Sequence, residues 1–177
     1  MEGRSLKTLS DLQKSEGFLI PGEVKLRFFS ADHPLKEEEK NRIIDNIVEI
    51  SKSFNVILQA FDSNRTYGKR HLISSLYHAL RSREREITHS RETAVDVVRY
   101  AAGERQIHLA FEKVGIRENT QHIAVLVYSP QKVMADIMKV LSDIMMRNGL
   151  KETEEKNVKR EDELEALERT ALLDLKL

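Results

Sequence analysis

Three segments of the chain have the apolar pattern of β-strands. Apolar residues at Val24, Leu26 and Phe28 alternate with polar ones, which predicts a half-buried strand. Residues 55–61 and 123–128 are short and almost wholly apolar, which is typical of strands buried on both faces. We therefore expect at least three strands, and two of them belong in the interior of a sheet.

Helical spacing of apolar residues covers most of the chain between and after these strands. The spacing predicts helices over residues 35–53, 69–85, 90–102, 107–114 and 130–148, followed by a helical or mixed element over 164–177. Ser90 and Ser129 are the expected N-caps of the third and fifth of these helices. Strands separated by helices predict an α/β fold in which helices pack on a mixed sheet.

The remaining segments are polar. We expect residues 1–16 to form a frayed lead-in and residues 151–162 to form a charged connector. No internal repeat or low-complexity linker divides the sequence, so residues 1–177 are expected to form one domain. The leucine-rich end, residues 163–177, is too apolar to stay in water and is expected to dock on its own domain or on a partner.

Composition excludes several classes of protein. The absence of cysteine excludes disulfides, thiolate metal sites and a cysteine nucleophile. No apolar run reaches the roughly 18 residues of a membrane span, and the first twenty residues lack the apolar stretch of a signal peptide. A cytoplasmic protein is the expectation.

Catalytic signatures are missing from the sequence. It contains no phosphate-binding glycine loop, no H-E-x-x-H and no G-x-S-x-G. His71 and His78 are seven residues apart on one helix face, but two imidazoles without a third ligand make a poor zinc site. We expect no enzyme, no metal and no cofactor; a histidine–carboxylate pair in a closed pocket is the alternative that would indicate an enzyme.

Charge is unevenly distributed, although 29 basic and 29 acidic residues give a net charge of zero. Residues 65–91 hold seven Lys and Arg against two Glu, whereas residues 151–177 hold six basic against nine acidic residues. Clustered cations suit phosphate groups, so the basic window is a candidate RNA-contacting surface. The alternative is a solvated helix end, but Lys69 and Arg70 at a helix start oppose the helix dipole and need another reason.

Four motifs then resemble a known family. They are Gly68-Lys69-Arg70-His71-Leu72, Gly103-Glu104-Arg105-Gln106-Ile107 with Ala110, Gly115-Ile116 before a central strand, and the terminal run from Leu167 to Leu175. In this order and spacing they resemble the small regulatory subunit of the KEOPS complex. The likeness covers about residues 55–128 and resumes at about residue 163.

The resemblance implies a fold, a function and two partners. The fold would be α/β, with a central, largely antiparallel sheet flanked by helices. The function would be that of a non-catalytic subunit in the synthesis of threonylcarbamoyladenosine on tRNA. It would bind the complex's small atypical protein kinase, which acts as an ATPase, and through it the sugar-kinase-like modification enzyme. Similar archaeal proteins also bind the 3′ CCA end of tRNA.

The resemblance also implies site residues. The RNA contact would use Lys69, Arg70 and His71. Arg83 and Arg91 would extend this basic patch. For Arg105 there are two interpretations, an RNA contact or a clamp on the helix junction at Gly103. The kinase contact would use Leu167, Ala171, Leu172, Leu173 and Leu175. A subunit that binds only protein and leaves RNA to other members is the second hypothesis.

Overall fold

The computed structural model of the chain describes residues 12–87 and 90–176. The strands are β1 (Leu12–Ser15), β2 (Phe18–Pro21), β3 (Glu23–Ala31), β4 (Ile57–Asp62), β5 (His122–Ser129) and β6 (Leu150–Thr153). The helices are α1 (Glu37–Phe54), the 3₁₀ turn η2 (Ser63–Arg65), α2 (Gly68–Glu84), α3 (Thr93–Ala102), α4 (Ile107–Val114), α5 (Met134–Arg147) and α6 (Arg160–Lys176).

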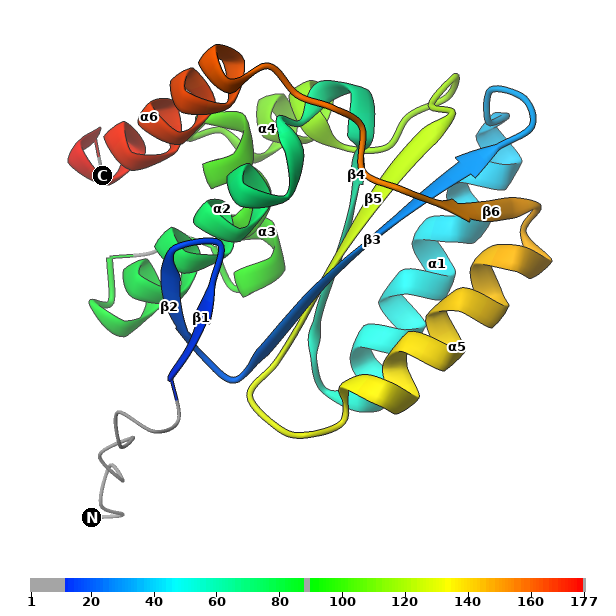
Figure 1. Ribbon diagram of the computed structural model, residues 1–177, viewed down its shortest axis with the longest axis horizontal. Helices are drawn as coiled ribbons and strands as arrows, with labels where there is room; N and C mark the ends of the chain where they lie inside the picture. Colours follow the sequence, from blue (N-terminus) through cyan, green and yellow to red (C-terminus); the bar gives the residue numbers. More distant parts are fainter. Residues whose placement is uncertain (1–11, 88–89, 177) are drawn as a thin grey trace.

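One four-stranded sheet divides the described part of the chain into two layers. The strand order is β4-β5-β3-β6, and every neighbouring pair is antiparallel. Helices α1 and α5 cover one face, while α2, α3, α4 and α6 lie on the other (Figure 1). The predicted α/β fold with a largely antiparallel sheet and flanking helices is confirmed.

The central strand β5 supplies both hydrophobic cores. Successive side chains of a strand point to opposite faces, so Ile123 and Val125 pack toward α1 and α5, whereas Ala124 and Leu126 pack toward α2 and α3. All four side chains are fully buried. This double burial explains the continuous apolar run that the sequence shows at this strand.

Two strands lie where the sequence predicted irregular structure. Leu150–Thr153 pairs with β3 as strand β6 and is not part of a charged connector. Only Leu150 of this strand is buried, and its other side chains lie at the exposed edge of the sheet. The strand therefore has no apolar pattern in the sequence. Leu12–Ser15 pairs with β2 around a two-residue turn at Glu16 and Gly17, whose φ values are 47° and 91°. The frayed lead-in is therefore wrong for residues 12–16, and residues 1–11 lie outside the described residues.

Two helices begin later than their predicted caps. Helix α5 begins at Met134, because the Ser129 hydroxyl forms hydrogen bonds with the backbone of Gln131 and closes a local turn. Helix α3 begins at Thr93, and the Ser90 hydroxyl donates to the carbonyl of Glu92.

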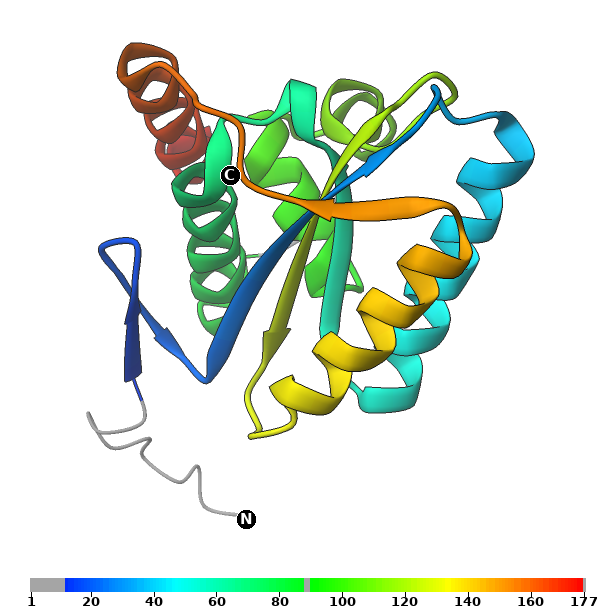
Figure 2. The ribbon, with the colours of Figure 1, turned by 45° about the vertical axis from the view of Figure 1, so that its right-hand side comes forward.

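The terminal helix α6 docks on its own domain, against α2 and α3 (Figure 2). Ala166, Thr170 and Leu173 recur at helical spacing and are buried. The Thr170 hydroxyl lies 3.2 Å from the carbonyl oxygen of Tyr100. Asp174 accepts hydrogen bonds from the Tyr100 hydroxyl and the His78 ring, at 2.5 Å and 2.7 Å. Leu173 is therefore a core residue, which corrects the prediction that it contacts a partner.

Truncation of Leu173 tests this docking. We expect Leu173→Ala to lower the free energy of unfolding by about 2–5 kcal/mol, because its side chain is 2% exposed and its loss leaves a cavity. The control Leu175→Ala, at a side chain 82% exposed, should change it by less than about 0.5 kcal/mol. Equal effects in urea denaturation of the two variants would contradict the docking.

Candidate functional site

The N-terminus of α2 is capped by a carboxylate from the connector that follows β6. The Glu155 carboxylate accepts the backbone N–H of Lys69, which satisfies one of the free donors of the helix end. Gly68 makes this approach possible, because a Cβ at this position would lie only 2.7 Å from Glu155 Oε1. The φ of Gly68, +85°, is also a backbone conformation that favours glycine. The connector therefore passes directly over the first turn of α2 (Figure 2).

The side chains of Lys69 and Arg70 lie at the surface beside this carboxylate. Lys69 Nζ lies 2.9 Å from the Glu16 carboxylate, and the lysine side chain keeps 44% of its surface exposed. Arg70 is exposed, and it forms no ion pair with residues 12–87 or 90–176. Both cations are accessible to an anionic ligand.

His71 is buried and holds the same helix end together from inside. Its Nδ1 accepts the backbone N–H of Tyr67 at 3.2 Å, and the ring also bonds the carbonyl of Ala101 in α3. With Nδ1 accepting, the proton of the neutral ring is on Nε2. Burial lowers the pKa of His71 to about 4, so the ring is neutral at pH 7. Because the side chain is 1% exposed, the prediction that His71 contacts RNA directly is corrected: its role is structural.

Two further arginines lie at this end of the α2–α3 pair. Arg105 follows the α3 C-terminus and is exposed. A clamp on the helix junction is one of the two interpretations of Arg105, and Arg99 makes such a contact, because its Nε donates to the Arg105 carbonyl at 2.8 Å. Arg169 of α6 places its guanidinium 5.3 Å from the centre of the Tyr67 ring. The sequence pattern does not indicate Arg169, because only the packing of α6 brings residue 169 beside residue 67.

Arg83 and Arg91 are not part of this cluster. Arg83 lies 14 residues beyond Lys69, which along a helix is about 21 Å. Its guanidinium pairs with the buried carboxylate of Asp96 at 2.9 Å and donates to the carbonyl of Arg91. Arg83 therefore ties α2 to α3, while Arg91 is exposed at the far end of α2. The structure does not bring these two residues to the candidate RNA site.

The outer face of α6 carries an apolar stripe. Leu164, Leu172 and Leu175 are 48%, 41% and 82% exposed, and Ala171 lies between them at the surface. Leu167 is half-buried at the border with the inner face. The sequence selected all of these except Leu164, whose helical spacing to Leu172 was the available signal.

A comparison with protein families identifies the class of protein. The family model for kinase binding protein CGI-121 matches residues 37–170. The chain belongs to the CGI-121 family. Members of this family are non-catalytic, kinase-binding subunits of the KEOPS complex. Membership of the family confirms the prediction that the chain is not an enzyme. A search of curated proteins found no match.

The histidine–carboxylate pair of this CGI-121 chain is structural. His78 and Asp174 lie between α2 and α6 with side chains 12% and 19% exposed, and His78 stacks on Tyr100 at 5.6 Å. Burial and the Asp174 carboxylate raise the pKa of Tyr100 above its ordinary value, so its hydroxyl remains a donor. Among residues 12–87 and 90–176, no three His, Asp or Glu side chains cluster as metal ligands. No helix in this part of the chain has the length and apolar character needed to cross a bilayer.

The buried ring of His71 predicts a pH dependence of stability. Its pKa is about 4 in the folded chain and 6.5 for a histidine in water, so the unfolded state takes up the proton first as the pH falls. Stability from this group is complete above pH 6.5 and is lost between pH 6.5 and 4. In urea denaturation we expect the wild type to lose on the order of 3 kcal/mol more than His71→Gln between pH 7 and 4. Identical pH profiles for the two proteins would contradict the buried neutral ring.

Proposed function

We propose that this CGI-121 family member binds the small atypical kinase of KEOPS through the outer face of α6, and the 3′ CCA end of tRNA through the start of α2. Through the kinase it joins the sugar-kinase-like enzyme that makes threonylcarbamoyladenosine in the cytoplasm. The observation that carries the proposal is the division of α6 into a buried inner face and an exposed leucine stripe.

The outer stripe supports the kinase contact. Leu172 and Leu175 are one turn apart, and Leu164 lies about two turns earlier on the same side of a helix whose inner face already has its partners. Full burial of a leucine side chain contributes about 1.5–3 kcal/mol, so removing two of them from water in a complex is a substantial gain. An apolar helix face of this kind fits a groove in a folded partner.

The basic residues near the start of α2 support the RNA contact. Lys69 and Arg70 lie on α2, Arg169 lies on α6, and Arg105 lies in the loop between α3 and α4. Arg169 contacts Tyr67 directly before α2, and a Cβ on Gly103 of the same loop would lie 3.5 Å from Arg169 Cβ. A CCA end offers three phosphates and unstacked bases, which cations and planar guanidinium groups bind. Arg169 already stacks on the Tyr67 ring, so an additional aromatic surface is close to these charges.

The protein-only hypothesis also has a specific observation in its favour. Two carboxylates of the same chain already occupy this region, Glu155 at the helix end and Glu16 beside Lys69. An RNA phosphate that approaches Lys69 competes with both. If these contacts persist, the chain regulates the kinase without touching RNA, and a gel shift of the isolated chain with tRNA separates the two hypotheses.

The kinase contact is tested by charge on the outer stripe. We expect the double variant Leu172→Lys, Leu175→Lys to bind the purified kinase at least tenfold more weakly, since two lysines would have to be desolvated in the interface. Met146→Lys on α5, at a side chain 59% exposed, is the matched control and should bind normally. Circular dichroism should show both variants folded. Normal binding by the double variant would exclude this face of α6.

The RNA contact is tested by charge reversal at the start of α2. We expect Lys69→Glu and Arg70→Glu each to weaken tRNA binding several-fold and to reduce its salt dependence, because each lost phosphate contact retains counterions on the RNA. Lys139→Glu, exposed on α5 at the other face of the sheet, makes the same change of charge and serves as control. If all three variants bind equally, the RNA assignment fails and the kinase contact is unaffected.

A further inference from the structure

The two edges of the central sheet are protected to very different degrees. Strand β6 is short, and its exposed edge carries Lys151 and Glu152, which discourage pairing with another strand. Strand β4, at the other edge, has six residues, and none of them is exposed. Its only charge is Asp62 at the strand end, where the carboxylate accepts hydrogen bonds from Thr120 and the backbone of Asn64.

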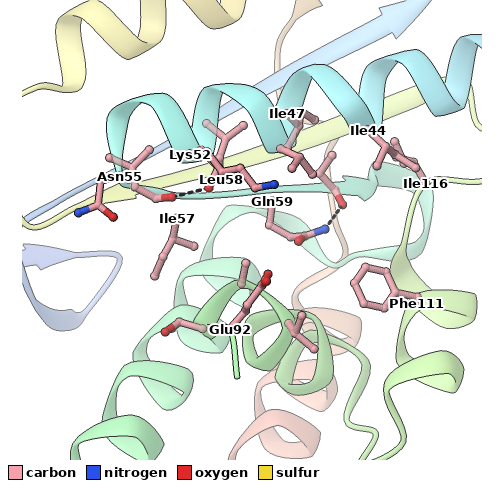
Figure 3. Close-up of a pocket in the computed structure, with 17 residues that line it drawn as sticks. Ile44, Ile47, Lys52, Asn55, Ile57, Leu58, Gln59, Glu92, Phe111 and Ile116 are labelled. Carbon is pink, nitrogen blue, oxygen red and sulfur yellow. Dashed lines mark hydrogen bonds between the residues drawn. The ribbon is translucent and has the colours of Figure 1, made fainter. Parts of the chain in front are cut away.

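The edge of β4 forms the floor of a cavity of about 580 Å³. Ile44 and Val48 of α1 form one wall, with 37% and 43% of their surface exposed. The opposite wall comes from the start of α3 and from Phe111, and Ile116 lies beside Ile44 at one end of the cavity (Figure 3). The edge strand is therefore recessed between two apolar walls, and none of its residues is exposed.

The backbone of β4 directs hydrogen-bonding groups away from its one neighbouring strand, β5. In an antiparallel pair alternate residues bond the neighbouring strand, so the others point their N–H and C=O groups away from β5. The carbonyl of Ala60 accepts the side-chain amide of Gln59 at 3.0 Å (Figure 3). A flexible amide of the chain itself thus stands where a neighbouring strand would donate.

The charge of the cavity restricts what can enter it. Lys52 and Glu92 are the charged residues among the 17 that line it, and they cancel. A nucleic acid or an acidic peptide finds no excess of cations here. An uncharged segment with small or branched apolar side chains matches both the floor and the walls.

We propose that an extended, uncharged, apolar peptide segment of a partner protein adds to β4 as a fifth strand of the sheet. Backbone hydrogen bonds to β4 supply the affinity, and side chains on one face of the segment contact Ile44 and Val48. A second copy of the chain fits less well, because both copies have a recessed edge and their walls would meet before the two strands could pair. This surface is separate from the outer face of α6 and from the start of α2.

The experiment uses the full chain, labelled with ¹⁵N, and the peptide acetyl-Ser-Val-Thr-Val-Thr-Val-Ser-amide as probe. We expect saturable shifts of the β4 amides and slower hydrogen exchange at alternate β4 positions. A peptide of the same sequence with alternate backbone nitrogens methylated keeps its side chains but loses its donors, and should bind at least tenfold more weakly. Val48→Lys should weaken binding of the unmodified peptide to a similar extent, whereas Met146→Lys, on an exposed site outside the cavity, should leave it unchanged.

Three results would overturn the proposal. The first is no binding of the unmodified peptide at millimolar concentration. The second is equal binding of the methylated peptide, which indicates adhesion without strand pairing, or equal binding by Val48→Lys, which indicates that the peptide does not contact the α1 wall. The third is concentration-dependent dimerisation in sedimentation that Val48→Lys abolishes, which assigns the edge to a second copy.

Discussion

The candidate surfaces depend on the docking of α6 against α2 and α3. Asp174 joins all three helices through the His78 ring and the Tyr100 hydroxyl, and Thr170 bonds the Tyr100 carbonyl next to the buried Leu173. A carboxylate that is largely removed from water is stable only when its hydrogen bonds are satisfied, so this arrangement fixes one orientation of α6. That orientation determines which leucines face solvent. It also brings Arg169 to Tyr67 at the start of α2.

Much of the fold could be predicted from the sequence, because periodicity directly reports burial. The apolar run of β5 and the helical stripes of α1, α2 and α5 follow from the layers that they face. Strand β6 gave no such signal, since its pairing with β3 is made by backbone groups while its side chains remain in water. The hairpin of β1 and β2 depends on a two-residue turn at Glu16 and Gly17 within a polar segment.

The site could be predicted only where its residues are close in sequence. Lys69 and Arg70 were found because cations at a helix start oppose the dipole. His71 follows Arg70 directly, but one further residue of the helix turns its side chain into the core. A short sequence motif does not show which of its side chains are buried. Arg83 is basic for a local reason, its pairing with Asp96, and Arg169 reaches the site through the tertiary fold alone. Composition therefore indicates a basic region of the chain, but only the packing of the helices shows which basic side chains lie at the candidate RNA site.

The central claim is that α6 has one face in the core and the other on the kinase. The most direct measurement is photo-crosslinking of the purified chain and kinase, with a benzophenone side chain introduced at position 172, 175 or 146 in separate proteins. We predict efficient crosslinks to the kinase from positions 172 and 175 on α6 and none from position 146 on α5. Crosslinks from position 146 with none from α6 would contradict this claim.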